Sequence, residues 1–374
     1  MALFALAKFN GYARICAGCH SAGYHWRLIL KNVKKGKIML NQVVQVKQAR
    51  RQAFAPCFLR VWLCKNFSGQ GLLLGGLWFA FLLFPIVLYA APEDNLKGDT
   101  GDFSFKDKVS GVDFLVYYYF PSKFDQDTPV MFYMHGINRD PAMARDVLVP
   151  YAEKKNLVVL SPLFSAQDFP SDSYAQGNAY SWDADAKRWS SVPEEKWSHP
   201  VIERLFSEFQ RRYPKSKQTG YYLCGQSAGG QYVHRFPLFV KEWRVKLFVA
   251  ANAGFYTLPD FKTSWPQGFR NTSFKQEVLH RYLGVPMVLL LGEKDTNTED
   301  PTLSKSERSM QQGPHRFARG QFYYKMGTEV AKEEKCQFGW KIQTVPEAGH
   351  GIRGVADAMT TIVREHADAE RKGK

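Results

Sequence analysis

Three side chains in this chain have the types and the order needed for nucleophilic hydrolysis. Ser227 lies in the pentapeptide GQSAG at 225–229, Asp295 ends the run LLLGEKD, and His350 lies in VPEAGHG. A serine hydroxyl needs a base that takes its proton, and the base needs an acid that orients it. We therefore predict a catalytic triad in which Ser227 attacks, His350 moves the proton and Asp295 fixes the histidine tautomer.

Alternatives exist for the acid and for the base. Glu299 and Asp300 follow Asp295 in the sequence DTNTEDP, and either carboxylate could serve instead. The preferred base is His350, between two glycines, because it follows the last predicted strand. We expect His234, in the helix after the serine, to pack or bond locally.

The residues around the serine predict a strand, a tight turn and a helix. An apolar run precedes Ser227, and a run able to start a helix follows it. Such a turn forces the serine into a strained backbone conformation and holds its hydroxyl above the sheet. Gly225 and Gly229 remove side chains that would collide across the turn. An incidental turn rich in glycine and serine is the plainer alternative for the pentapeptide alone.

Acyl transfer also needs backbone N–H groups that stabilise the developing oxyanion. We expect one from Ala228, directly after the nucleophile at the start of the helix. We expect the second from Ile137, in the loop that follows the apolar run PVMFYMH at 129–135. A strand that simply ends at a glycine is the alternative explanation of the sequence before Ile137.

The elements that must position these groups alternate between strand and helix. Apolar runs predict strands, and amphipathic runs predict the helices between them. The strands are expected over 112–120, 129–135, 157–163, 246–251, 286–291 and 341–345, with a further one in the apolar run 221–224 before the pentapeptide; the helices are expected over 141–155, 201–213, 315–333 and 353–370. This pattern predicts the α/β class, with a mostly parallel sheet covered by helices on both faces.

Two segments depart from the alternation of strands and helices. Residues 92–110 are polar and are expected to form a linker or irregular lead-in to the first strand. Residues 165–199 form a long insertion that carries three tryptophans. Long loops in such folds tend to be functional, although its aromatic residues could equally pack onto the edge of the sheet.

Charge and hydropathy separate residues 1–91 from the rest of the chain. The net charge is +15, but 12 of the 50 Lys and Arg lie in residues 1–90, which contain no Asp or Glu. The other 38 nearly balance the 35 acidic residues. The basic excess therefore belongs to this leader and gives no reason to expect a nucleic-acid partner for the body.

An uncharged apolar segment at 71–91 ends the leader and follows a basic stretch. This arrangement is typical of a signal peptide, and the segment is also long enough to remain as an N-terminal membrane anchor. Both interpretations export residues 92–374, the catalytic domain, to the periplasm or the exterior. A twin-arginine signal at 50–51 is disfavoured because about 20 residues separate it from the apolar segment.

The cysteines offer two further hypotheses. The sequence CAGCH at 16–20 matches a c-type haem attachment pattern, but it precedes the export segment. We prefer to interpret residues 1–38 as an over-extended start or a non-structural leader. In the body, Cys224 and Cys336 could form a disulfide in an oxidising compartment, although Cys224 is expected to be a buried apolar residue.

Several blocks together resemble a known family. FYMHGINRD, YYLCGQSAGGQYVHRF, AANAGFYTLPD, LLLGEKDTNTED and VPEAGHG resemble α/β-hydrolase serine esterases, in particular the polyhydroxybutyrate-depolymerase-like and feruloyl-esterase-like group, over about residues 110–368. The resemblance implies the α/β-hydrolase fold and hydrolysis of a small or polymeric ester through an acyl-serine, with no metal or organic cofactor. A serine peptidase and a catalytically silent binding protein of the same fold are the alternatives. Arg316 and Arg319 recur in such sequences, but no role for them follows from the sequence.

Overall fold

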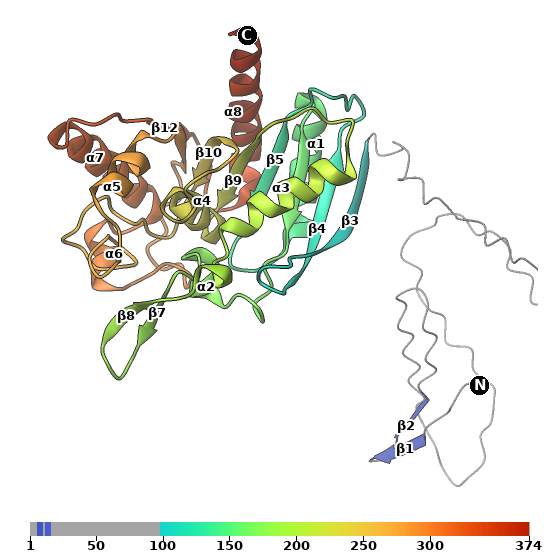
Figure 1. The fold of residues 1–374 in the computed structure, drawn as a ribbon, viewed down its shortest axis with the longest axis horizontal. Helices are drawn as coiled ribbons and strands as arrows, with labels where there is room; N and C mark the ends of the chain where they lie inside the picture. The colour runs from blue at the N-terminus through green and yellow to red at the C-terminus, as the bar shows by residue number, and fades with distance from the viewer. Residues whose placement is uncertain (1–5, 10–11, 16–97, 374) are drawn as a thin grey trace, which may run out of the picture. The chain divides into compact units, whose positions relative to one another are not determined.

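A computed structural model describes residues 6–9, 12–15 and 98–373 (Figure 1). Near the N-terminus, β1 (Leu6–Phe9) and β2 (Tyr12–Ile15) pair in an antiparallel two-stranded sheet. The apolar segment predicted at 71–91 and the CAGCH sequence lie outside the described residues. Among the helices that are described, none has the length and apolar character that would cross a bilayer.

The body is built on an eight-stranded sheet with the order β12-β11-β10-β9-β5-β6-β4-β3. β5, β6 and β9 to β12 run parallel, while β3 and β4 form an antiparallel edge. The strands are β3 (Asp99–Lys106), β4 (Asp113–Phe120), β5 (Val130–Met134), β6 (Val158–Pro162), β9 (Tyr221–Gln226), β10 (Val245–Ala251), β11 (Met287–Gly292) and β12 (Trp340–Val345). The predicted mostly parallel α/β sheet is confirmed.

The prediction of an irregular lead-in at 92–110 is wrong in part, because β3 lies within this range. β3 pairs with β4 along its whole length. Its side chains alternate in exposure, and Phe103 is its one buried residue. An antiparallel edge strand with one solvated face needs no continuous apolar run. The hydrophobic pattern that identifies the central strands was therefore missing here.

Helices cover both faces of the sheet, as predicted. α1 (Pro141–Lys155) and α8 (Ile352–Lys372) pack on one face. The other face carries α3 (Pro200–Arg212), α4 (Ala228–Phe239), α5 (Gln276–Gly284) and α7 (Arg316–Glu333), and α3 crosses the sheet in Figure 1. In β9, Tyr222 and Cys224 pack toward α1 and α8, and Leu223 packs toward the opposite face. Burial on both faces explains the continuous apolar runs.

Local chemistry fixes the bounds of α1. The Asp140 carboxylate accepts a hydrogen bond of 2.9 Å from the backbone N–H of Met143, and Pro141 occupies the first turn. A proline is tolerated there because the N–H groups of the first turn have no partner within the helix. Asn156, with a φ of 51°, ends the helix in the left-handed conformation. The observed bounds equal the predicted range of 141–155.

The insertion at 165–199 is ordered into short elements. It contains α2 (Ser171–Ala175), a hairpin of β7 (Tyr180–Asp183) and β8 (Arg188–Ser191), and a 3-10 turn at Glu194–Lys196. The hairpin projects from the body in Figure 1. Trp197 packs against Phe239 of α4, whereas Trp182 contacts Trp189 across the hairpin and remains half exposed. Only part of the aromatic set therefore packs onto the body.

Candidate active site

The backbone around Ser227 makes the sharp turn that the sequence predicts. Ser227 follows the last residue of β9 directly and precedes α4, with φ 59° and ψ −117°. A positive φ is strained for a residue that carries a Cβ. A Cβ added at Gly229 would lie 1.9 Å from the carbonyl oxygen of Met134, and one at Gly225 would lie 2.5 Å from that of Gly229. Both glycines are thus required by close backbone contacts.

The structure brings Ser227, His350 and Asp295 into one hydrogen-bonded chain. His350 Nε2 lies 3.0 Å from Ser227 Oγ, and His350 Nδ1 lies 2.8 Å from Asp295 Oδ2. An ionised carboxylate only accepts hydrogen bonds, so Nδ1 carries the proton and Nε2 is free to accept from the serine hydroxyl. Asp295 is 2% exposed, which shields this ion–dipole contact from water.

The alternative acids occupy different positions. Asp300 accepts hydrogen bonds from Arg316 and Thr302, while the side chain of Glu299 is 86% exposed and lies 3.8 Å from Lys305. Burial raises the pKa of the Asp300 carboxyl, but the hydrogen bonds from Thr302 and Arg316 outweigh it and hold this pKa well below its ordinary value. Asp295 is the carboxylate of this loop that contacts His350.

His234 is buried in α4, as expected for a locally bonded residue. Its Nδ1 lies 2.9 Å from the carbonyl oxygen of Gly230, and its Nε2 accepts from the backbone N–H of Thr257 at 3.1 Å. Burial lowers the pKa of His234 well below its ordinary value. A neutral imidazole whose two nitrogens bond to the backbone is a structural element of this helix.

Two side chains that the sequence did not point out hold the loop of His350. The Gln226 amide nitrogen donates to the carbonyl oxygen of His350. Asn252, directly after β10, donates to the carbonyl oxygen of Gly349 at 3.2 Å and accepts from the N–H of Gly292 at 2.8 Å. Asn252 thus joins the segments that carry His350 and Asp295. The only signal in the sequence was that Gln226 lies within the pentapeptide and Asn252 follows a predicted strand.

The predicted oxyanion loop lies next to Ser227. A Cβ added at Gly136 would be 3.9 Å from Ser227 Cβ. Ile137 and Ala228, whose N–H groups are the predicted donors, line the same cavity. Their position beside the serine is compatible with the predicted role.

His135 supports this loop from below. Its Nε2 accepts from the backbone N–H of Phe164 at 3.1 Å, so its proton is on Nδ1, which donates to the carbonyl oxygen of Gly136 at 2.9 Å. Burial lowers the pKa of His135 to about 4. The imidazole therefore stays neutral at physiological pH and keeps both backbone contacts.

Arg139 and Tyr174 brace the same loop from the side. Arg139 donates to the carbonyl oxygens of Phe164 at 2.6 Å and Phe169 at 2.8 Å, and its guanidinium lies 4.4 Å from the centre of the Tyr174 ring. The Tyr174 hydroxyl donates to the carbonyl oxygen of His135 at 2.8 Å. The insertion at 165–199 thus contacts the active site through Tyr174.

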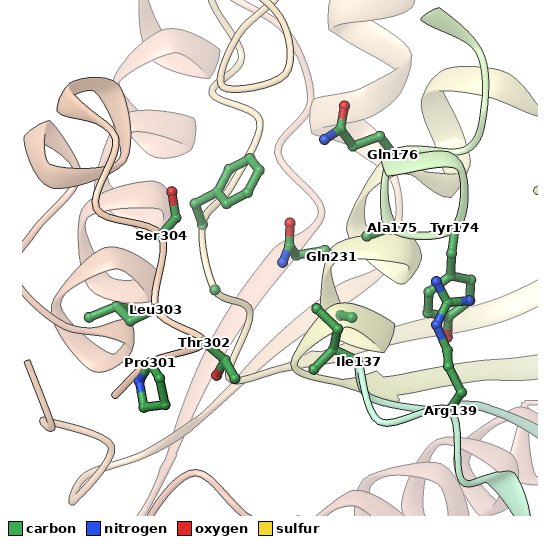
Figure 2. A pocket seen from close by; sticks show the side chains of 13 residues that line it. Ile137, Arg139, Tyr174, Ala175, Gln176, Gln231, Pro301, Thr302, Leu303 and Ser304 are labelled. Atoms are coloured by element: carbon green, nitrogen blue, oxygen red, sulfur yellow. The ribbon is translucent and has the colours of Figure 1, made fainter. Parts of the chain in front are cut away.

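A cavity of about 380 Å³ is lined by thirteen residues, among them Ala228, which follows Ser227 in the chain (Figure 2). Pro301–Ser304 form one side, and Ile137 lies opposite with Gln231 between them. Most of the lining is apolar, with a few polar groups, as in ordinary small-molecule sites. Gln231 Oε1 accepts from Arg235 Nη1 at 3.2 Å, which fixes the amide nitrogen as the end that can donate into the cavity.

Metal-ligating side chains and cysteines can also form functional sites, and both were sought in the part of the chain that the structure describes. Over those residues, no group of three or more His, Cys, Asp or Glu is placed to hold a metal ion. Cys224 and Cys336 are both free thiols, Cys224 buried in β9 and Cys336 partly exposed. Burial raises the pKa of Cys224 well above its ordinary value, as expected for an inert core cysteine.

Two enzymes are among the solved structures that this chain resembles. The chain is 36% identical to poly(aspartic acid) hydrolase-1 from Sphingomonas sp. KT-1, with a TM-score of 0.67, over 72% of this chain and 99% of that one. It is 30% identical to a poly(3-hydroxybutyrate) depolymerase from Bordetella parapertussis, with a TM-score of 0.63, over 72% of this chain and 89% of that one. Searches of protein-family models and of curated proteins find no match.

The fold and these identities agree with the family expected from the sequence blocks. The parallel sheet with its antiparallel edge, the turn at Ser227 and the covering helices are shared by enzymes of this kind. Both similar structures are hydrolases, and this chain covers nearly the whole of each. The chain belongs to the α/β-hydrolase superfamily of serine esterases and is a carboxylic ester hydrolase.

Proposed function

We propose that Ser227, His350 and Asp295 are the catalytic triad of this hydrolase and cleave carboxylic esters through an acyl-serine. The observation that carries the proposal is the continuous chain from Ser227 Oγ to His350 Nε2 at 3.0 Å and from His350 Nδ1 to Asp295 Oδ2 at 2.8 Å. A nucleophile within hydrogen-bond reach of a base that is itself oriented by an acid is the arrangement that acyl transfer needs.

The reaction proceeds in two symmetrical halves. Ser227 Oγ attacks the ester carbonyl carbon while His350 Nε2 takes the hydroxyl proton, and Asp295 stabilises the resulting imidazolium. The tetrahedral intermediate collapses, His350 gives the proton to the departing alcohol, and an acyl-serine remains. Water then attacks this ester with His350 as base, the proton returns to Ser227 Oγ, and the carboxylic acid leaves.

The backbone N–H groups of Ile137 and Ala228 stabilise the oxyanion in both halves. Ala228 is the first residue of α4, where backbone N–H groups lack partners within the helix and the helix dipole favours negative charge. Ile137 follows Gly136, which passes close to Ser227. Loss of one such donor typically lowers kcat by about 10²- to 10³-fold.

The substrate is an ester of a short acid whose chain carries further carbonyl groups, either free or as part of a polyester. The mostly apolar cavity accommodates the carbon chain, and the amide nitrogen of Gln231 donates to a carbonyl oxygen in it. The 30% identity to a poly(3-hydroxybutyrate) depolymerase supports a polyester of this type. Esters of aromatic acids, expected from the resemblance to feruloyl esterases, are the competing ester class.

Amide hydrolysis is a second candidate. The 36% identity to poly(aspartic acid) hydrolase-1, which by its name acts on a polyamide, favours this possibility specifically. The same triad can act on an amide, because His350 would protonate the leaving amine in place of the alcohol. A catalytically silent binding protein would need a defect in the triad, and the hydrogen-bonded Ser227 argues against it.

Export of the catalytic domain, 92–374, by the leader at 1–91 is also part of the proposal. Its support is the uncharged segment 71–91 after a basic stretch without acidic residues. N-terminal sequencing and fractionation of cells that express the full chain would distinguish a cleaved signal from a retained anchor. Intact protein in the cytoplasmic fraction would contradict export.

A panel of substrates tests the reaction and the bond type together. Wild type and Ser227→Ala are compared on p-nitrophenyl esters, hydroxybutyrate oligomers, feruloyl esters, and aspartyl oligomers. We expect the wild type to hydrolyse at least one ester series and Ser227→Ala to lose that activity by about 10⁴-fold or more, with an unchanged Tm. Retention of most activity by the folded variant would refute the triad, and a preference for aspartyl oligomers would favour the amide candidate.

A further inference from the structure

Two arginines from the first turn of α7 are buried next to the active site. Arg316 is 1% exposed and Arg319 is 0% exposed. A guanidinium is buried at a high cost unless its N–H groups find acceptors. The acceptors of both residues therefore indicate what the two charges stabilise.

Arg319 joins two walls of the cavity. Its Nη1 donates to the carbonyl oxygen of Gly254 at 2.5 Å, and its Nη2 donates to that of Ser304 at 2.8 Å. Gly254 and Ser304 both line the cavity, one after β10 and the other after β11. Its Nε donates to the carbonyl oxygen of Gly313 at 2.9 Å, which anchors the guanidinium at the start of α7.

Arg316 links Asp295, the predicted acid, to the cavity wall at 301–304. Its Nη1 lies 3.7 Å from Asp295 Oδ1 and 3.1 Å from Asp300 Oδ2. Its Nη2 donates to the hydroxyl of Thr302 at 2.7 Å, and Thr302 lines the cavity. The free oxygen of the Asp295 carboxylate, opposite the one that accepts from His350, therefore faces a buried cation.

We propose that Arg316 and Arg319 are positioning residues, which make the acid of the triad and the walls of the acyl cavity one rigid unit. Arg319 sets the distance between the two cavity walls that carry Gly254 and Ser304, and this distance determines which acyl chains fit. Arg316 sets the rotation of the Asp295 carboxylate and with it the orientation of His350. This inference rests on the proposed triad function of Asp295 and on substrate binding in the cavity.

The geometry of arginine suits this task. A guanidinium is planar and presents its N–H groups in a fixed fork, so two acceptors bound to it are held at a fixed separation. A lysine in the same place supplies one rotatable ammonium group and cannot fix two walls at once. The two segments that Arg319 joins are 50 residues apart along the chain, so their spacing depends on side-chain contacts of this kind.

The test uses Arg319→Lys, Arg319→Met, Arg316→Lys and Arg316→Met in the full chain. Lys325→Met serves as the matched control, since Lys325 lies on the same helix with a side chain that is 73% exposed. Each variant is characterised by Tm, by labelling of Ser227 with a small fluorophosphonate, and by kcat and KM on p-nitrophenyl esters from acetate to octanoate.

We expect the Arg319 variants to lose selectivity before they lose reactivity. The spread of kcat/KM across the ester series should narrow by about tenfold or more in Arg319→Met and by less in Arg319→Lys, while fluorophosphonate labelling stays within about threefold of wild type. A uniform change across all esters in folded Arg319 variants would overturn the assignment, because a merely structural role lowers every rate alike.

For Arg316 we expect the variants to lose reactivity while their selectivity among esters stays unchanged. Arg316→Met should lower kcat about 10²-fold on every ester, with KM and the spread of selectivity unchanged, and Arg316→Lys should recover part of the loss because it keeps the charge. A kcat within about threefold of wild type in a folded Arg316→Met would refute its role. If wild-type Ser227 itself fails to react with the fluorophosphonate, the proposed function fails first, and the two failures remain distinguishable. If the methionine variants do not fold, the same measurements on Arg319→Lys and Arg316→Lys decide the question.

Discussion

The sharpest test of the acid assignment is Asp295→Asn. In the wild type, Asp295 Oδ2 accepts from His350 Nδ1 at 2.8 Å and Oδ1 lies 3.7 Å from the Arg316 guanidinium. An asparagine fits the same space. Its oxygen should turn toward the cation, because its amide N–H groups would be repelled there, and the amide nitrogen then faces His350 Nδ1.

This orientation reverses the histidine tautomer. An amide nitrogen donates to Nδ1, so the imidazole proton moves to Nε2 and Nε2 can no longer accept the proton of Ser227. We therefore expect kcat to fall by about 10⁴-fold, equivalent to about 5 kcal/mol in the activation free energy. The fold should persist, because the exchanged groups have the same size and keep a hydrogen bond.

The assay is kcat and KM on a p-nitrophenyl ester for Asp295→Asn beside Asp300→Asn and Glu299→Gln, with Tm as the folding control. Glu299→Gln should match the wild type, because its side chain is 86% exposed. Asp300→Asn should stay within about tenfold of wild type, since it supports Arg316 and does not contact His350. Asp295 is not the acid of the triad if the kcat of folded Asp295→Asn stays within tenfold of wild type, or if Asp300→Asn or Glu299→Gln loses more activity than Asp295→Asn does.

Three further outcomes follow from the structure. Gly229→Ala should destabilise the fold by about 3 kcal/mol or more in urea denaturation, because its Cβ would lie 1.9 Å from a backbone carbonyl oxygen. The control Gly284→Ala, whose Cβ would lie 3.8 Å from the nearest atom, should be nearly neutral. Equal stabilities of the two variants would contradict the packing at the turn. Burial lowers the pKa of His135 to about 4 and of His199 to about 3, so both stay neutral in the folded state while the unfolded chain takes up protons below about pH 6.5. Their contribution to stability is complete above that pH and is lost as the pH falls toward the folded values. The two histidines together should therefore lower the free energy of unfolding by about 2.5 kcal/mol between pH 7.5 and 5.5, and a flat profile would count against buried neutral histidines. Gln226→Leu, which removes the donor to the backbone of the base, should lower kcat about tenfold at unchanged KM, and a change confined to KM would place Gln226 in substrate binding instead.

Much of the fold follows from local sequence patterns. Strands buried on both faces read as apolar runs, and β5, β9 and β11 were therefore predictable from composition alone. The pattern failed at β3, where polar residues alternate with partly buried ones at the edge of the sheet. An edge strand of this kind buries only one face, so apolar residues are needed at every second position at most and no continuous apolar run marks the strand.

The active-site residues divide in the same way. Ser227, Asp295 and His350 each follow a predicted strand, so parallel topology alone suggested that they meet at one edge. The residues that position them could not be predicted, because their contacts join segments far apart in the chain. Asn252 reaches Gly349, and Arg319 reaches Gly254. Nothing in the local pattern around a buried arginine or asparagine specifies such partners.

The proposed mechanism requires a covalent acyl intermediate on Ser227. The most direct measurement mixes the full-length protein with a fluorophosphonate and, separately, with a slowly released p-nitrophenyl ester. The site of attachment is then mapped by peptide mass spectrometry. We expect one equivalent of adduct on Ser227, a matching burst of p-nitrophenolate, and neither signal in Ser227→Ala. An adduct on another residue, or turnover without any acyl-enzyme, would contradict the proposed mechanism.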